Sequence, residues 1–325
     1  LSARETGENH SIPLGGTKEG RSLKQKARDN LAAVELVKKI EAEDRPATPE
    51  EQQKLSLYVG WGGLSGAFHD STGKFGKGFD EIGARLRDLL TDEEYRTASR
   101  STQYAHYTAE NIVRAMWGAV ERMGFKGGKV FEPGMGIGHF IGMMPEELAG
   151  ATSYSGIELD HFTARIAKLL YPRSGVKQAD FTKLPMPKNA YDLVIGNPPF
   201  SDAVIRSDPD YAKHGFMLHD YFFAKSLDAV RPGGLMAFVT SAGTMNKIDP
   251  SAREYLAERA DFVGGVRLPS SSFQQSSNTE VTTDILFFRK RPEVETEPRS
   301  FETDWTETRN VSLPDADGGT QRGAV

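Results

Sequence analysis

The four residues Asn197, Pro198, Pro199 and Phe200 directly follow an apolar run at 192–196 that is typical of a buried strand. Two successive prolines restrict the backbone and supply no N–H donor, so the carbonyl groups beside them are left as acceptors. The side-chain oxygen of Asn197 and the carbonyl oxygen of Pro198 can then both accept hydrogen bonds from one amino group. Phe200 adds a flat ring against which a planar molecule can stack. These groups suit chemistry on the exocyclic amine of a planar base, and we disfavour the alternative of a turn without function.

A glycine-rich segment at 130–140 has glycines at alternate positions from Gly134 to Gly138, after a short apolar stretch. Glycines at the end of a strand allow a ligand to approach the backbone at the carboxyl edge of a parallel sheet. The dinucleotide pattern G-x-G-x-x-G fails because its last glycine is missing, which disfavours a nicotinamide dehydrogenase. The form that begins at Glu132, E-P-x-x-G-x-G, is instead typical of S-adenosylmethionine enzymes. A structural turn without a ligand is the alternative.

Two acids follow the next two predicted strands. Glu158 ends the first of them, where a carboxylate can accept hydrogen bonds from ribose hydroxyl groups. That role would indicate a nucleoside, and an acid at a helix N-terminus is the alternative. Asp180 ends the second and could accept from an adenine amino group, while Phe181 could pack on the adenine ring. Taken alone, Phe181 fits a core position at least as well.

Together these motifs resemble the amino DNA methyltransferases, which methylate adenine N6 or cytosine N4, and within them the adenine group with the cofactor-binding half first. Residues 105–109 match that family's upstream cofactor motif, with Ala109 where the family usually has proline. The stretches 58–63 and 282–286 narrow the resemblance to the N-terminal methylase part of phage- and plasmid-borne methylase–helicase proteins of the anti-restriction type. The resemblance covers residues 56–291.

The resemblance implies a methyl transfer from S-adenosylmethionine to the N6 amine of adenine in double-stranded DNA, with base flipping. It implies that Asn197, Pro198 and Phe200 are catalytic, and that Pro199 and Phe200 contact the target base. Thr108 would contact the methionine carboxylate of the cofactor. The full set implied to bind the cofactor is Tyr107, Thr108, Glu132, Gly134, Gly136, Glu158, Asp180, Phe181 and Asn197. The loop at 201–214 would form a lid or a DNA contact.

The apolar patterns around these motifs alternate between the periods of strands and helices. This alternation predicts an α/β fold with a doubly wound, mostly parallel, seven-stranded sheet and an N-terminal helical extension. The resemblance implies the Rossmann-like class I methyltransferase form of this fold. The predicted strands are 129–132, 154–159, 176–179, 192–196, 235–240, 262–266 and 283–289. The predicted helices are 22–42, 109–123, a helix ending near 171, 218–230 and 251–259.

Composition divides the chain into four segments. We expect a disordered tail at 1–20, a helical and loop extension at 21–100, the methyltransferase domain at 101–291 and an acidic linker at 292–325. Within the extension, residues 58–79 combine glycines with aromatic residues and two lysines. This stretch is interpreted as a packed loop that supports the core, with a nucleic-acid surface as the alternative.

Residue counts exclude several classes of protein. The absence of cysteine excludes disulfides, thiolate zinc sites and the cysteine nucleophile of C5-cytosine methyltransferases. The scattered histidines predict no metal site. No apolar run reaches the roughly 18 residues of a membrane span, and no signal peptide is apparent, so we expect a cytoplasmic protein. The resemblance implies that a bacterium, phage or plasmid encodes it.

The formal net charge of −5 is concentrated in the acidic segment after residue 291, which leaves a neutral body. We therefore expect good cofactor binding but weak DNA binding, with further domains of a longer protein, such as a helicase, delivering DNA. The alternative is that the first 100 residues read DNA. Rival functions are an RNA adenine methyltransferase, a protein glutamine methyltransferase and a cofactor-binding module without catalysis.

Overall fold

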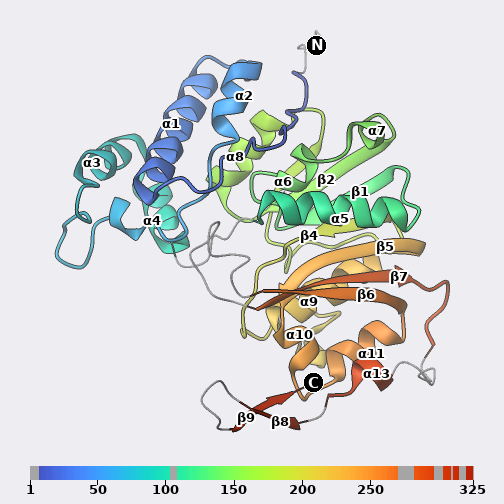
Figure 1. The fold of residues 1–325 in the computed structure, drawn as a ribbon. Helices are drawn as coiled ribbons and strands as arrows, with labels where there is room; N and C mark the ends of the chain where they lie inside the picture. The colour runs from blue at the N-terminus through green and yellow to red at the C-terminus, as the bar shows by residue number, and fades with distance from the viewer. Residues whose placement is uncertain are drawn as a thin grey trace.

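The computed structural model describes residues 7–102, 108–269, 282–295, 303–308, 310–314 and 320–324. A central sheet carries helices on both faces, and a group of N-terminal helices lies to one side of it (Figure 1). The α/β class, the sheet and the helical extension predicted from the sequence are thus confirmed.

The central sheet has seven strands in the order β3-β2-β1-β4-β5-β7-β6. Strand β7 is antiparallel to both of its neighbours, and the other strands run parallel. Each strand overlaps a predicted one. Their bounds are β1 (Gly128–Pro133), β2 (Thr152–Glu158), β3 (Gly175–Gln178), β4 (Tyr191–Gly196), β5 (Val230–Ser241), β6 (Ala260–Leu268) and β7 (Thr283–Lys290).

Successive side chains of a strand point to opposite faces, so each central strand feeds two cores. In β1, Val130 joins the core under the N-terminal helices and Phe131 joins the opposite core. In β4, Leu193 and Val194 divide in the same way. Since both faces of the sheet are covered, its central strands read as nearly continuous apolar runs.

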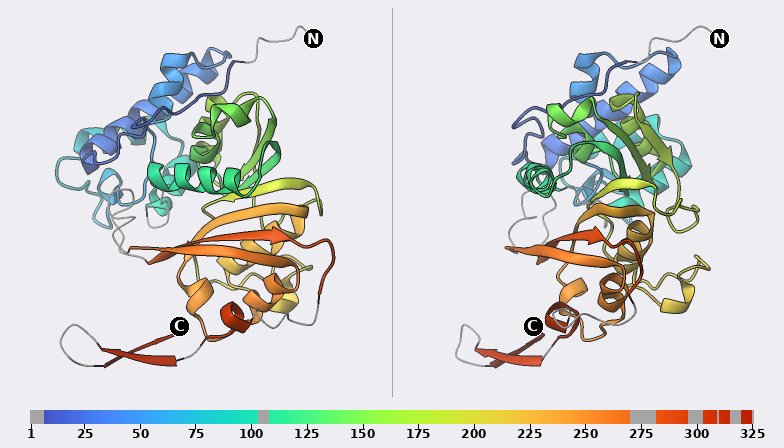
Figure 2. Two further views of the ribbon diagram at one scale, coloured as in Figure 1. Left: turned by 45° about the vertical axis from the view of Figure 1, so that its right-hand side comes forward. Right: turned by 90° about the vertical axis from the view of Figure 1, so that its right-hand side faces the viewer.

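Helices α5 (Glu110–Arg122) and α8 (His161–Leu170) supply side chains to the first core. Helices α9 (Leu218–Ala229) and α11 (Ser251–Ala257) supply side chains to the second core, on the other face (Figure 2). Four short elements lie in the connections: α6 (His139–Gly142), α7 (Glu146–Ala149), α10 (Gly243–Asn246) and the short 3-10 helix η2 (Ala212–His214).

The N-terminal extension is a helical layer packed on the first core. Thr48 and Thr91 each begin a helix with a capping box, to Glu51 and Glu94 respectively, which satisfies N–H groups that a helix leaves unpaired. Its elements are α1 (Leu23–Ala42), α2 (Pro49–Leu55), η1 (Ser65–Ala67), α3 (Asp80–Leu89) and α4 (Asp92–Ser101). Helices α1 and α2 contact α8, so the extension and the α/β domain share one core.

The loop at 58–79 is a packed support rather than an open aromatic surface. Tyr58, Trp61 and Phe68 are each no more than 3% exposed. Trp61 lies edge-on to Tyr58, with ring centroids 6.2 Å apart, and edge-on to Phe68, with centroids 5.2 Å apart. Buried rings of this kind are not available to stack on bases, which favours the first of the two interpretations made from the sequence.

The segment at 7–20 differs from the disordered tail that we expected at 1–20. The backbone N–H of His10 donates to the Leu170 carbonyl at 2.8 Å, and that of Ile12 donates to the Gly142 carbonyl at 2.7 Å. Ile12 is 3% exposed. A single buried apolar residue and backbone partners on the domain are enough to order a segment whose average composition is polar.

The acidic segment after residue 291 also differs from the expected linker. It contains α13 (Thr303–Thr306) and a hairpin of β8 (Asn310–Pro314) and β9 (Thr320–Ala324). Trp305 packs against Phe262, at 5.2 Å between ring centroids, and against Phe288 at 5.8 Å. One tryptophan supplies a large apolar surface that an averaged composition hides.

Within the described residues, none of the helices has the length and apolar character that crossing a bilayer requires. In the same part of the chain, no group of three or more histidine, aspartate or glutamate side chains has a metal-binding arrangement.

Candidate functional site

The predicted motifs meet at one edge of the sheet. Strands β1, β2 and β4 run parallel, with Pro133 paired to Ile157 and Phe131 paired to Val194. Their carboxyl ends therefore lie side by side, where α/β sheets bind ligands. The glycine segment follows β1, Glu158 ends β2, and the Asn-Pro-Pro-Phe motif follows β4.

The glycine segment turns tightly over the end of β1. Gly134 and Gly138 have φ values of +69° and +86°, a region that glycine adopts without steric cost. The backbone N–H of Met135 donates to the Ile157 carbonyl at 2.9 Å, which ties the turn to β2. A Cβ atom on Gly134 would lie 3.5 Å from Cδ of Pro199, so the glycine segment lies beside the Asn-Pro-Pro-Phe motif.

Glu158 is fixed by the backbone of this turn. Its Oε2 accepts from the N–H of Gly136 and its Oε1 from the N–H of Asp160, both at 2.8 Å. Burial raises the pKa of the Glu158 carboxyl to about 7, although these N–H groups lower it. Each oxygen keeps a second lone pair, and those lone pairs can accept from the hydroxyl groups of a ribose.

Glu132 serves the interior of the domain. It is 2% exposed, and its Oε2 accepts from the Tyr154 hydroxyl at 2.6 Å. Burial raises the pKa of the Glu132 carboxyl well above its usual range, and the nearby Glu158 raises it further. The carboxyl therefore links β1 to β2 beneath the site, and its direct contact with a cofactor stays a prediction.

Asp180 and Phe181 lie in the turn that follows β3. Asp180 Oδ1 accepts from the backbone N–H and the hydroxyl of Thr182, and its Oδ2 lies 3.3 Å from Lys183 Nζ. Burial raises the pKa of Asp180, but the hydrogen bonds from Thr182 and Lys183 outweigh it and hold the pKa below its usual range. Phe181 is 4% exposed and packs on Phe222 at 4.7 Å between centroids, so it is a core residue in this structure. Its contact with the cofactor adenine stays a prediction.

The Asn-Pro-Pro-Phe motif holds an unsatisfied acceptor. The Oδ1 atom of Asn197 is buried and has no hydrogen-bond partner. Pro198 is buried, Pro199 is exposed, and Phe200 is half-buried and packs against the core. Burying a polar atom without a partner costs about 1–3 kcal/mol, and a catalytic role is one of the explanations for such an atom in a folded protein.

The upstream motif is described only in part. Tyr107 lies outside the described residues, together with 103–106. Thr108 is 6% exposed and precedes α5. Its backbone lies close to the ring of His139, the first residue of α6. Burial lowers the pKa of His139 to about 4. Thr108 is thus held beside the glycine segment, as a contact with the same ligand requires.

The loop at 201–214 is anchored to α9. His219 Nδ1 lies 3.3 Å from the carbonyl oxygen of Ser201, and Val204 forms a β-bridge with Met217. The loop ends in η2, and Asp208 within it is buried. Its role as a lid or a DNA contact stays a prediction.

Leu159 is a further candidate for the site that the sequence analysis did not single out. It directly follows Glu158 and is 64% exposed, among the most exposed large apolar residues described. Its side chain thus offers an apolar contact beside Glu158, which suits the flat face of a nucleoside base. The available signal was an apolar residue placed between the two acids Glu158 and Asp160, at the point where β2 ends.

Comparison with known proteins bears on this arrangement. Residues 154–269 match the family model of the Eco57I restriction-modification methylase. Defense against restriction protein B of Escherichia phage P1 is 26% identical over 284 residues, which are 84% of this chain and 11% of that protein. Type II methyltransferase M.TthHB8I of Thermus thermophilus is 29% identical over 248 residues, which are 64% of this chain and 55% of that protein. The chain thus spans about a tenth of the first relative and about half of the second.

Solved structures bear on the fold. A Listeria monocytogenes protein assigned to the class I S-adenosylmethionine-dependent methyltransferases has a TM-score of 0.53 at 15% identity, over 85% of this chain and 91% of that one. The fold is that of a class I S-adenosylmethionine-dependent methyltransferase. A type I restriction-enzyme modification subunit from Vibrio vulnificus has a TM-score of 0.50 at 18% identity, over 78% of this chain and 64% of that one. The chain thus resembles the restriction-modification methylases in sequence and the class I S-adenosylmethionine-dependent methyltransferases in fold, in agreement with the predicted cofactor.

Proposed function

We propose that this chain transfers a methyl group from S-adenosylmethionine to the exocyclic N6 amine of adenine in DNA. The observation that carries the proposal is the buried, unpartnered Oδ1 of Asn197 at the end of β4. An acceptor of this kind suits a substrate that brings an N–H donor. The neighbouring glycine segment, which Gly134 brings against Pro199, would hold the methyl donor beside it.

The residues at the ends of β1 to β3 fit the parts of this cofactor. Glu158 offers acceptors to the ribose, and the exposed Leu159 offers an apolar face to the adenine. Asp180 lies one strand further, where its carboxylate can accept from the adenine amino group. Thr108 and Gly134 would flank the methionine part. Once bound, the cofactor would supply a methyl group on a positively charged sulfur, which is a strong electrophile.

The residues of the Asn-Pro-Pro-Phe motif act on the amine. The lone pair of the exocyclic amine is delocalised into the purine ring, so this nitrogen is a weak nucleophile. Asn197 Oδ1 and the Pro198 carbonyl would accept its two hydrogens and favour tetrahedral geometry, which directs the lone pair toward the methyl group. Transfer would form the N–C bond as the C–S bond of the methyl donor breaks, leaving S-adenosylhomocysteine, and the amine would release one proton to water. In-line positioning supplies most of the rate enhancement.

The target adenine must leave the duplex to reach this site. Flipping it out costs on the order of a few kcal/mol, and stacking on one aromatic ring returns about 1–3 kcal/mol. Phe200, half-buried against the core beside this motif, is the proposed stacking platform. We also assign Pro199, which is exposed, to contact with the flipped base.

The comparisons favour DNA over the rival substrates. The matching family and both relatives are named for restriction or its methylases. Methylation of adenine in RNA or of a glutamine in protein is the second candidate function. A cofactor-binding module without catalysis would not account for the unpartnered Asn197 acceptor. Because the chain spans 11% of the phage relative, we propose that it works with further domains, including a helicase, in the cytoplasm of a bacterial cell.

The test is transfer of a radiolabelled methyl group to pools of DNA, RNA and protein, followed by identification of the labelled nucleoside or amino acid. We expect N6-methyladenine in DNA, formed on the order of 100-fold more slowly with Asn197→Ala. Label in RNA or glutamine alone would replace DNA as the substrate. Absence of label in every pool, together with tight cofactor binding, would support the module without catalysis.

A further inference from the structure

One buried lysine on α9 joins two loops of the site. Lys225 is 4% exposed, and its Nζ has three hydrogen-bond acceptors. It donates to the Phe181 carbonyl at 2.9 Å, to Asp208 Oδ2 at 2.7 Å and to the Tyr221 hydroxyl at 2.9 Å. An ammonium group has three N–H donors, so these contacts use its full capacity.

The two loops belong to different halves of the proposed reaction. The Phe181 carbonyl follows Asp180, in the turn assigned to the cofactor adenine. Asp208 lies in the loop at 201–214, which continues from the Asn-Pro-Pro-Phe motif assigned to the target base. Inside that loop, the backbone carbonyl of Asp208 accepts from the N–H groups of Tyr211 and Ala212, so Asp208 organises the turn that carries it.

The Asp208 carboxylate accepts from the backbone N–H of Asp210 at 3.2 Å and from two side-chain donors, of which Lys225 is one. Tyr221 donates its hydroxyl to the same Oδ2 at 2.7 Å. Burial raises the pKa of the Asp208 carboxyl, but the hydrogen bonds from Lys225 and Tyr221 outweigh it and hold the pKa below its usual range. The ammonium also lies 5.0 Å from the centroid of the Phe181 ring, which adds a cation–π contact to the same turn.

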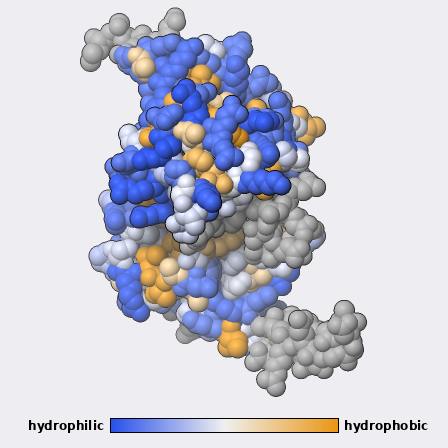
Figure 3. Space-filling view, turned by 90° about the vertical axis from the view of Figure 1, so that its left-hand side faces the viewer, coloured by the Kyte–Doolittle hydropathy of each residue, from blue (hydrophilic) through white to orange (hydrophobic). Residues whose placement is uncertain are grey.

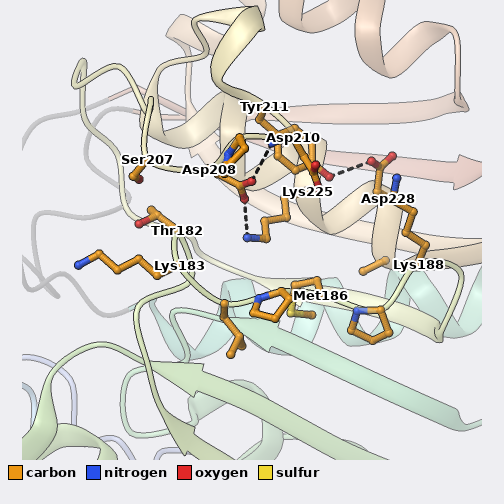
Figure 4. Close-up of a pocket in the computed structure, with 15 residues that line it drawn as sticks. Thr182, Lys183, Met186, Lys188, Ser207, Asp208, Asp210, Tyr211, Lys225 and Asp228 are labelled. Atoms are coloured by element: carbon orange, nitrogen blue, oxygen red, sulfur yellow. Dashed lines mark hydrogen bonds and ion pairs between the residues drawn. The ribbon is translucent and has the colours of Figure 1, made fainter.

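A cavity of about 250 Å³ lies beside these contacts. Figure 4 shows Lys225 reaching between one wall at Thr182–Lys188 and another at Ser207–Tyr211, with its dashed contact to Asp208. Both walls also pack on Tyr221, whose ring centroid lies 6.1 Å from that of Phe181 and 5.5 Å from that of Tyr211. The Lys225 ammonium, with the Tyr221 hydroxyl beside it, adds a charged hydrogen-bonded link between the two walls.

We propose that Lys225 and Asp208 are positioning residues that couple the cofactor turn to the target-base loop. This inference rests on the proposed function. Apolar residues commonly replace buried ion pairs without loss of stability, so stability alone does not call for a charged pair here. The pair instead fixes two irregular backbones relative to each other. Ordering one loop therefore orders the other, and cofactor binding prepares the surface that receives the base.

The decisive variant is Asp208→Asn, which keeps the shape of the side chain and removes its charge in the target-base loop. We expect the Kd for S-adenosylmethionine, measured by calorimetry, to rise about tenfold, as for the loss of one charge-assisted hydrogen bond. Hydrogen exchange should increase at 180–184 as well as at 203–212. Asp210→Asn is the matched control, because Asp210 is exposed in the same loop and its side chain does not contact Lys225.

Lys225→Met is the second variant, with Lys188→Met as its control on the exposed rim of the same cavity. We expect the same paired increase in exchange and the same loss of affinity. If Lys225→Met does not fold, Asp208→Asn carries the test. Cofactor affinity and exchange at 180–184 that match those of the Asp210→Asn control would overturn the proposal. Neither readout needs DNA, so a wild-type protein that binds the cofactor but leaves DNA unmethylated would reject the proposed function and still test the coupling.

Discussion

The Glu158 carboxylate accepts a hydrogen bond at 2.8 Å from the backbone N–H of Gly136, across 22 positions of sequence. The acid after β2 and the glycine turn after β1 are therefore one structural unit. Burial raises the pKa of Glu158 to about 7, which lies within the physiological range. The ability of this unit to accept from ribose hydroxyls then depends on pH.

We expect affinity for S-adenosylmethionine to fall as the pH is lowered from 8 to 6. An acid with a raised pKa is ionised only above it, so the carboxylate loses acceptor capacity below about pH 7. Glu158→Gln should lose about 1.5–3 kcal/mol of binding free energy at pH 8. It should also lose the pH dependence. Calorimetric titrations of both proteins at several pH values check this, and a wild-type affinity that stays flat across the range would contradict it.

Asn197→Ala should reduce kcat on DNA by on the order of 100-fold, the size of effect seen when one preorganised hydrogen-bonding group is removed from an active site. Because Asn197 is also among the residues implied to bind the cofactor, we expect a loss of cofactor affinity that is smaller than the loss of turnover. The melting temperature should not fall through loss of an Oδ1 bond, because that oxygen has no partner to lose. Single-turnover methylation, calorimetry and thermal unfolding separate these effects. A variant that retained turnover would remove Asn197 from catalysis.

Phe200→Ala should weaken turnover on duplex DNA by about 1–3 kcal/mol in kcat/KM, the value of one stacked base. Phe200→Tyr should retain activity because it keeps the ring. Both variants should bind the cofactor like the wild type. Steady-state kinetics on a defined duplex provides the measurement, and wild-type behaviour of the alanine variant would assign stacking to another aromatic residue.

Gly156→Ala should destabilise the protein by roughly 1–3 kcal/mol, as expected for an overpacked core. A Cβ atom there would lie 2.5 Å from Met135 Sδ and 3.2 Å from the Glu132 carbonyl oxygen. Denaturant unfolding measures the loss. Gly150→Ala is the matched control, since a Cβ atom at that position meets nothing within 4 Å. Equal stability of the two variants would show that Met135 can move aside without a loss of unfolding free energy.

We expect the chain to bind duplex DNA weakly, with relaxed sequence preference, at about 0.15 M salt. A chain with a net charge of −5 gains little electrostatic attraction to the phosphates of DNA. The aromatic residues Tyr58, Trp61 and Phe68 are buried and cannot stack on bases. Gel-shift and methylation assays on random and defined duplexes test this expectation. Tight binding with one clear methylated motif would contradict it and would assign sequence recognition to residues 18–79.

The sequence predicted the strands and the motif that follows each of them, because both are marked by local patterns of residues. Apolar runs predicted every strand of the central sheet, and prolines and glycines at 134–138 and 197–200 marked where the chain turns at its edge. Parallel strands then bring such turns together, whatever the details of packing. The cofactor family could be inferred at the same stage.

Only the tertiary structure decided which groups of those motifs are buried and what they contact. It directs Glu132 to Tyr154, packs Phe181 in the core and leaves Asn197 Oδ1 without a partner. It also anchors Ile12 and Trp305, each in a segment of polar composition, and joins Lys225 to Asp208. Desolvation and pairing depend on residues far apart in the chain, and local patterns and averaged composition carry no record of that proximity.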